Sequence, residues 1–167
     1  MTVADHRPIV KTIVWHDESE TAGFARSLAA QPGIAGALIA LRGDLGAGKT
    51  SFVRHLLGAL GVTGRVKSPS YTVVEPYSLD PSAERPCAMD IWHFDFYRFN
   101  DPNEWEEAGF RDTFASRGLK LVEWPDKAGA HLPQPDLSIG IAVGEGETRN
   151  VTLTSHTPTG AGLLAGV

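Results

Sequence analysis

The chain has 167 residues, of which 42% are hydrophobic and 21% are charged, and its formal net charge is −5. This composition is ordinary for a globular protein of one domain with a sizeable core. No apolar run approaches the length of a membrane span, the first residues lack the apolar core of a signal peptide, and the single cysteine allows no internal disulfide. We therefore expect a cytoplasmic protein with no membrane partner. The negative charge argues against strong non-specific binding of nucleic acid by this chain alone.

The N-terminal third begins with a predicted strand and helix. Residues 9–15 are dominated by β-branched side chains, which favour a strand. Asp17 followed by Glu20 is a helix-start signal, and Pro32-Gly33 ends that helix. The short apolar run at residues 37–41 is typical of a buried parallel strand.

Residues 43–51, Gly-Asp-Leu-Gly-Ala-Gly-Lys-Thr-Ser, match the pattern of a phosphate-binding loop between that strand and an amphipathic helix closed by Gly61. In such a loop the backbone N–H groups and the helix N-terminus face the phosphates. Lys49 would reach the β- and γ-phosphates, and the Thr50 hydroxyl would ligate Mg²⁺. The predicted nucleotide-binding residues are Asp44, Leu45, Gly46, Ala47, Gly48, Lys49, Thr50 and Ser51.

A stretch rich in hydroxyl groups follows at residues 67–72, Lys-Ser-Pro-Ser-Tyr-Thr. Pro69 disfavours a helix here, and a strand is predicted to start within residues 71–75. A loop of this kind beside bound phosphate could sense the γ-phosphate, as nucleotide switch segments do. A plain turn explains the same residues equally well. Residues 79–86 are predicted to form a surface loop.

Residues 88–98 are predicted to form one long strand, which places His93 and Asp95 on the same face. Asp95 lies between two phenylalanines, an unfavourable place for a carboxylate unless it is paired or linked to a metal. It could orient a Mg²⁺-bound water or the attacking water. For His93 an ordinary structural role is the commoner one.

A second carboxylate, Glu123, lies at the C-terminal end of the predicted strand at residues 119–124, which Pro125 stops. An apolar strand that delivers an acid at its C-terminal end is what a Mg²⁺ site opposite the phosphate loop needs. A surface salt bridge is the alternative role for Glu123.

The remaining elements complete the predicted domain. Asp101-Pro102-Asn103-Glu104 carries the signals of a helix start, and Gly109 ends that helix. Residues 137–143 and 148–154 are predicted to form a hairpin. The composition after residue 154 offers little to bury, so we expect one domain over residues 1–154 and a flexible tail over residues 155–167.

Taken together, these motifs resemble the TsaE (formerly YjeE) family of bacterial ATPases of tRNA threonylcarbamoyladenosine biosynthesis. The resemblance covers roughly residues 9–153. It is carried by the phosphate loop at 43–50, Val-Lys-Ser-Pro-Ser-Tyr-Thr at 66–72, Val-Glu-Pro-Tyr at 74–77, His-Phe-Asp-Phe-Tyr-Arg at 93–98, residues 101–112, and Leu-Val-Glu-Trp-Pro at 121–125. Ser70, Ser51 and Trp105 stand where the family usually has Thr, Thr and Leu, and none of these departures removes a charge or a metal ligand.

The resemblance implies an α/β fold, similar to P-loop NTPases: a mixed sheet with a parallel centre, antiparallel flanking strands and helices on both faces. It implies ATP hydrolysis with Mg²⁺, coupled to the TsaB and TsaD subunits, which modify the adenosine beside the anticodon of tRNA. The tRNA would be reached indirectly, through that complex. The resemblance assigns Mg²⁺ to Thr50 and Glu123, catalysis or water ordering to Asp95, a switch-like loop to Ser70 and Thr72, and a place beside the site to Trp124.

Two other functions are compatible with a phosphate loop. A small-molecule kinase would need a second substrate pocket and usually an arginine-rich lid, and the chain has no arginine cluster after residue 98 beyond Arg111 and Arg117. A nucleotide-binding regulatory subunit would bind ATP without hydrolysing it. Single-turnover hydrolysis with Mg²⁺ separates that role from an ATPase.

Overall fold

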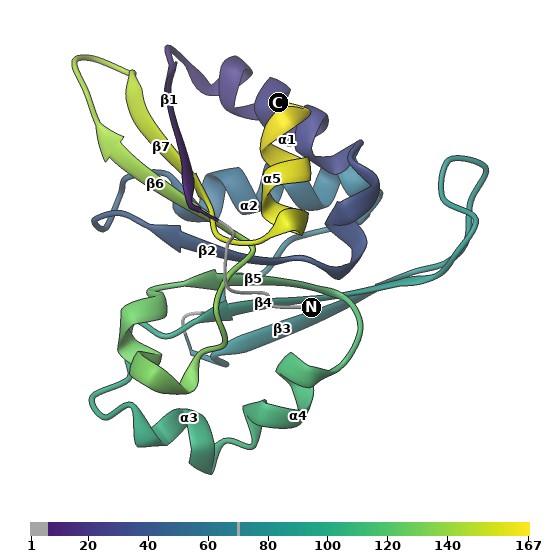
Figure 1. The fold of residues 1–167 in the computed structure, drawn as a ribbon, viewed down its shortest axis with the longest axis vertical. Helices are drawn as coiled ribbons and strands as arrows, with labels where there is room; N and C mark the ends of the chain where they lie inside the picture. The colour runs from purple at the N-terminus through teal and green to yellow at the C-terminus, as the bar shows by residue number, and fades with distance from the viewer. Residues whose placement is uncertain (1–6, 70) are drawn as a thin grey trace.

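The computed structural model describes residues 7–69 and 71–167, and its described part is organised around a seven-stranded sheet (Figure 1). The strand order is β1-β7-β6-β2-β5-β4-β3. The strands are β1 Ile9–Trp15, β2 Leu38–Arg42, β3 Val74–Leu79, β4 Met89–Asp95, β5 Leu119–Glu123, β6 Leu137–Val143 and β7 Arg149–Ser155.

The centre of the sheet is parallel and its flanks are antiparallel. Strand β2 pairs in parallel with β5 and β6, and β5 pairs in parallel with β4. Strands β1, β7 and β3 are added in antiparallel pairs. The predicted mixed sheet is therefore confirmed. Its four parallel strands bring their carboxyl ends to one edge, where open α/β sheets bind ligands.

Helices cover both faces of the sheet, as predicted (Figure 1). One face carries α1 Glu18–Ala29, α2 Lys49–Leu60 and α5 Pro158–Ala165, whose apolar residues share a core with Ile39 and Leu41 of β2. The other face carries α3 Asn103–Glu107, α4 Phe110–Ala115 and the 3₁₀ helix η3 Pro125–His131, packed around Leu38 of β2 and Phe94 of β4. A second 3₁₀ helix, η2 Pro32–Gly36, precedes β2. Among the described residues, no helix has both the length and the apolar character needed to cross a bilayer.

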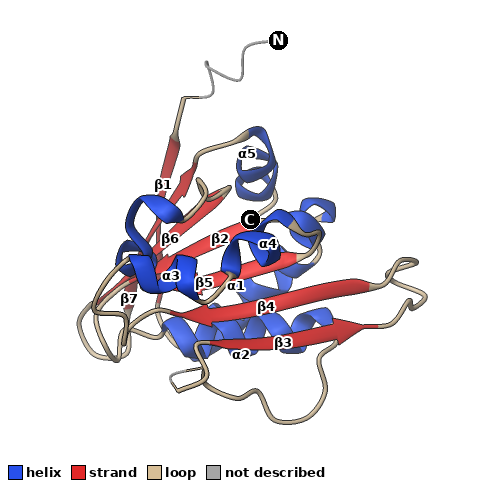
Figure 2. Ribbon diagram, turned by 90° about the horizontal axis from the view of Figure 1, so that it is seen from below, coloured by secondary structure: helices blue, strands red, loops and turns tan. Residues whose placement is uncertain are grey.

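Local signals explain several of the boundaries. The Asp17 carboxylate accepts the Glu20 backbone N–H at 3.0 Å and starts α1, and Gly61 closes α2 with a φ of 111°. Strand β4 ends at Asp95, three residues before the predicted end. The Asp95 carboxylate accepts the Tyr97 N–H at 2.9 Å, a local bond that turns the chain out of the strand. The loop between β3 and β4 projects from the body of the molecule, as expected for a surface loop (Figures 1 and 2).

Helix α4 is absent from the sequence prediction, which ended the helical segment at Gly109. Gly109 instead has a φ of 74° and separates α3 from α4. Phe110 and Phe114 lie one turn apart on α4 and both contact the ring of Phe94, with ring centroids 5.2 and 4.6 Å away. Tertiary packing on the sheet therefore supports this helix, whose own sequence carries weak helix signals.

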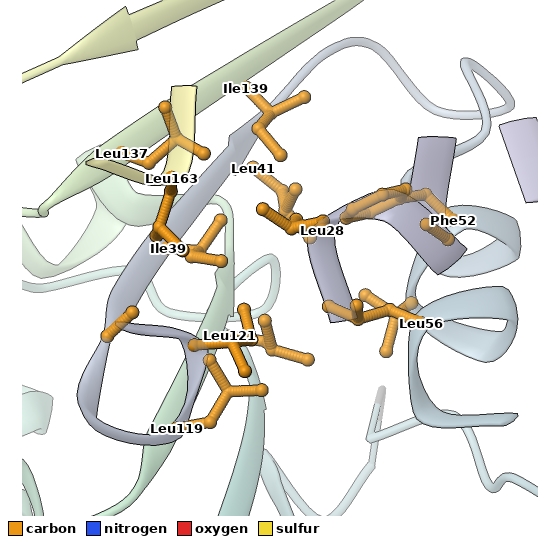
Figure 3. Close-up of a cluster of buried hydrophobic side chains, with 14 of the residues drawn as sticks. Leu28, Ile39, Leu41, Phe52, Leu56, Leu119, Leu121, Leu137, Ile139 and Leu163 are labelled. Carbon is orange, nitrogen blue, oxygen red and sulfur yellow. The ribbon is translucent and has the colours of Figure 1, made fainter. Parts of the chain in front are cut away.

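The prediction of a flexible tail over residues 155–167 is wrong. Ser155 is the last residue of β7, and the Thr157 side chain then caps α5 by accepting the Gly160 N–H at 3.1 Å. Leu163 and Leu164 are buried, and Figure 3 shows Leu163 beside Ile39 and Leu137. The segment is rich in small residues, which suggested that it had too little apolar surface to pack against the domain. However, small residues let the helix lie close to the sheet, and two leucines are enough to anchor it.

We predict that Leu163→Ala lowers the free energy of unfolding by about 2–5 kcal/mol, because it leaves a cavity under α5. Thr159→Ala, at an exposed position of the same helix, should change it by less than about 0.5 kcal/mol. Urea unfolding followed by circular dichroism measures both. Equal stability of the two variants would show that α5 contributes little to the core.

Candidate nucleotide-binding site

The phosphate loop joins the end of β2 to the start of α2, and its glycines are required by its shape. Gly43 has a φ of 149°, and a Cβ atom there would lie 2.5 Å from the carbonyl oxygen of Ile141 in β6. Gly48 has a φ of 111° and is the N-cap of α2. Both conformations are rare for residues with a side chain. These glycines therefore let the loop pass close to the sheet and lead directly into the first turn of α2.

Lys49 is buried in this loop. Its ammonium group donates to the carbonyl oxygens of Gly43 and Asp44, the second at 3.0 Å, and lies 4.4 Å from the ring centroid of Trp124. Burial lowers the pKa of Lys49, an effect that the nearby carboxylates of Glu123 and Asp95 oppose. The cation is thus held at the loop by bonds to backbone carbonyls, which negative phosphate oxygens could replace.

Thr50 and Glu123, to which the resemblance assigns Mg²⁺, lie within hydrogen-bonding distance of each other. The Thr50 hydroxyl donates to the Glu123 carboxylate at 3.1 Å to Oε1, and Glu123 is only 2% exposed at the end of β5. A hydroxyl and a carboxylate suit Mg²⁺, which usually takes one or two protein oxygens and completes its shell with phosphates and water. The described residues hold no cluster of three or more His, Cys, Asp or Glu side chains that could bind a metal without phosphate. A surface salt bridge for Glu123 is excluded by its burial.

Asp95 lies next to Glu123, because the two residues are paired in register across β4 and β5. Its side chain is almost fully buried and accepts the Tyr97 N–H at 2.9 Å. Burial raises the pKa of Asp95, and the negative charge of Glu123 adds to the effect, whereas the bond from Tyr97 opposes it. Two carboxylates therefore stand side by side opposite Lys49.

His93 also belongs to this group, although no sequence pattern connected it with Glu123. Its side chain is fully buried, and its Nε2 lies 2.6 Å from Oε2 of Glu123. The available signal was its position on the same strand face as Asp95, two residues earlier. That spacing alone could not reveal a partner 30 residues away.

A cavity of about 330 Å³ opens over these side chains. Trp124 borders it with a left-handed backbone, φ 58°, which turns its ring over Lys49 and against Tyr97. Tyr97 and Arg98 were not predicted as site residues. The cavity is lined by Leu45, Gly46, Gly48, Lys49, Thr50, Ser51, Asp95, Tyr97, Arg98, Glu123 and Trp124.

A second cavity of about 360 Å³ lies on another side of the same loop and shares Gly48 and Ser51 with the first. Arg149 of β7 borders it and donates from Nε to the carbonyl oxygen of Ala47 at 2.9 Å, which fixes the loop from this side. The other lining residues come from β1, the start of α1 and the β6–β7 turn: Trp15, Asp17, Glu18, Thr21, Gly146 and Glu147. The site thus has room for more than a phosphate chain.

The described part of the predicted switch segment does not line either cavity. Ser70 lies outside the described residues, and Thr72 is exposed, with its hydroxyl donating to Glu75 at 3.0 Å. Thr72 borders neither cavity, so its role stays a prediction. The segment is nevertheless tied to the site. The Val73 carbonyl accepts the Asp95 N–H at 2.9 Å, and Val73 has a φ of 69°, which a β-branched residue rarely adopts.

The raised pKa of Asp95 leads to a pH prediction. The folded chain binds this proton more tightly than the unfolded chain, so the ionised Asp95 lowers stability at neutral pH, and this cost vanishes as the pH falls below the ordinary carboxyl range. Asp95→Asn should therefore raise the free energy of unfolding at pH 7 by about 0.5–2 kcal/mol, with a gain that shrinks towards about pH 4.

The amide can still accept the Tyr97 N–H, so the change isolates the charge. Urea unfolding across this pH range measures the gain, and Asp112→Asn, at an exposed carboxylate, should show none. A loss of stability in Asp95→Asn at pH 7 that disappears towards pH 4 would mean that the charge of Asp95 is stabilising.

Comparisons with known proteins point to the same family. The family model described as threonylcarbamoyl adenosine biosynthesis protein TsaE matches residues 15–151. The tRNA threonylcarbamoyladenosine biosynthesis protein TsaE of Haemophilus influenzae is 38% identical over 128 residues, which are 77% of this chain and 76% of that protein. The protein of the same name from Bacillus subtilis is 33% identical over 150 residues, 87% of each chain.

A solved structure extends the similarity to the fold. The crystal structure of YdiB from Bacillus subtilis superposes with a TM-score of 0.75 at 28% identity and covers 96% of this chain and 95% of that chain. The family model spans most of the chain, including the phosphate loop and the strands that carry Asp95 and Glu123. The chain therefore belongs to the family of threonylcarbamoyl adenosine biosynthesis proteins called TsaE.

Proposed function

We propose that this protein is a Mg²⁺-dependent, slow ATPase that acts on the TsaB–TsaD complex in the threonylcarbamoylation of tRNA adenosine. The observation that carries the proposal is the meeting of Lys49 and Thr50, at the end of the phosphate loop, with the carboxylates of Asp95 and Glu123. The family membership supplies the pathway. In this proposal the protein works in the cytoplasm and reaches tRNA through its partners.

In the proposed complex with ATP, the phosphate chain lies along the loop and the start of α2. The loop N–H groups and the Lys49 ammonium bind the phosphate oxygens, and Lys49 exchanges its bonds to Gly43 and Asp44 for them. The second cavity continues from Ser51 towards Arg149, and it offers space for the nucleoside.

The metal role falls to Thr50 and Glu123. Their oxygens lie within hydrogen-bonding distance of each other at the end of the loop. Mg²⁺ bound there would neutralise negative charge that develops on the phosphates during hydrolysis. Glu123 would also orient the Thr50 hydroxyl before the nucleotide arrives.

Hydrolysis needs a group that orders the attacking water, and Asp95 is the best placed acid for it. Its carboxylate lines the cavity beside Glu123, and the Tyr97 N–H fixes its orientation. A fixed acceptor of this kind positions a water with little reorganisation in the transition state. The bond between Val73 and the Asp95 backbone would let the segment containing Ser70 and Thr72 respond to the state of the nucleotide.

The nucleotide site is tested with Lys49→Ala. The substitution removes the cation that faces the phosphates, so we expect ATP affinity or hydrolysis to fall at least about tenfold. Isothermal titration calorimetry and phosphate release measure the two quantities. Lys127→Ala, which removes an exposed lysine elsewhere, should retain both. A folded Lys49→Ala protein with unchanged affinity and hydrolysis would contradict the assignment of the loop.

The pathway role is tested by reconstitution. Purified TsaB and TsaD, with tRNA and their activated threonylcarbamoyl substrate, should carry out more turnovers of tRNA modification when this protein and ATP are added. The Lys49→Ala form should not raise the turnover, because the proposed effect depends on ATP. Equally fast modification without this protein would rule out the role, even if the ATPase activity is real.

A further inference from the structure

His93 occupies an unusual position for a histidine. Along β4, the side chains that face α2 are Met89, Ile91, His93 and Asp95, and the first two belong to the apolar core. His93 is fully buried at the point where this column changes from apolar to polar. A buried imidazole without hydrogen-bond partners costs free energy, so its partner explains its position.

The partner is the carboxylate of Glu123. An ionised carboxylate only accepts hydrogen bonds, so Nε2 of His93 carries the hydrogen in the 2.6 Å contact with Oε2. The other ring nitrogen, Nδ1, is buried and has no hydrogen-bond partner among the described residues. The bond to Glu123 is therefore the one hydrogen bond that the structure gives this side chain among the described residues.

The Glu123 carboxylate receives hydrogen bonds from two different elements. His93 donates to Oε2 from the neighbouring strand, and Thr50 donates mainly to Oε1 from the start of α2. His93 does not line the cavity, whereas Thr50 and Glu123 do. A ligand that enters the cavity would meet the Thr50 side of the carboxylate and leave the His93 side in place.

We propose that His93 is a positioning residue that sets the orientation of the Glu123 carboxylate towards Thr50 and a bound divalent cation. This inference rests on the proposed function. The last torsion of a glutamate side chain has broad minima, so a hydrogen bond decides its angle. Removing a hydrogen-bond partner of a metal-ligating side chain typically costs about 10–100-fold in metal affinity or activity.

The experiment compares nucleotide affinity with and without the metal. A non-hydrolysable ATP analogue is titrated calorimetrically in Mg²⁺ and in a chelator, and the ratio of the two dissociation constants is the Mg²⁺ gain. His93→Leu removes the donor at similar volume and should reduce the gain by about tenfold or more, with metal-free affinity within about threefold of the parent. His93→Gln can place an amide N–H near the position of Nε2 and should recover most of the gain.

Two controls separate positioning from general stability. Ile91→Val loosens the same column of β4 without touching Glu123, and it should leave the gain unchanged. In a Glu123→Gln background, His93→Leu should have no further effect on the gain, because the carboxylate that it orients is gone. If His93→Leu does not fold, His93→Asn replaces it and is compared with His93→Gln. The asparagine side chain is shorter, so its amide does not reach Oε2 of Glu123.

The outcomes distinguish this inference from the proposed function. A parent protein with no Mg²⁺ gain overturns both. If the parent shows a Mg²⁺ gain and His93→Leu (or His93→Asn in its place) retains that gain, the role of His93 is overturned. The proposed function is then unaffected. An equal loss of gain in Ile91→Val also overturns the role of His93, since the effect would then come from the stability of β4.

Discussion

The buried carboxylate of Glu123 is the constraint on which the site depends. Removing an ionised carboxylate from water costs on the order of several kcal/mol unless nearby groups compensate. Here the compensation comes from Thr50 of α2 and His93 of β4, while the charge of Lys49 lies close by. One carboxylate thus ties its own strand to the phosphate loop's helix and to a neighbouring strand, and it fixes the spacing of the groups that face the cavity.

The packing of the sheet gives these polar groups their precision. Leu119 and Leu121 precede Glu123 on the same face of β5 and are fully buried, and Ile91 precedes His93 and Asp95 on β4 in the same way. Close-packed cores contain few voids and are hardly compressible, so they hold the strands in place. The apolar part of each strand therefore stabilises the fold, and its last residues place polar side chains at the edge where the parallel strands end.

The loop and the two acids could be predicted because their signals are local. Glycine spacing defines the loop, and a carboxylate at the end of an apolar strand is visible without the fold. The contact of Arg149 with Ala47 could not be predicted, because 102 residues separate them and only the sheet order brings β7 beside the loop. Helix α5 was missed for a different reason: the prediction weighed the average composition of the segment. It overlooked the helix-start signal Thr157-Pro158 and the two leucines that follow it.

If the proposed function is right, the charges of the site favour joint binding of nucleotide and metal. Phosphates that replaced the Gly43 and Asp44 carbonyls at Lys49 would also approach Asp95 and Glu123, whose negative charges would repel them. Lys49 offsets part of this repulsion, and burial already lowers its pKa. A divalent cation between Glu123 and the phosphates changes the sign of that interaction, so each ligand should favour the binding of the other. In the proposed function, a carboxylate that weakens metal-free binding is therefore the same group that makes binding with Mg²⁺ selective.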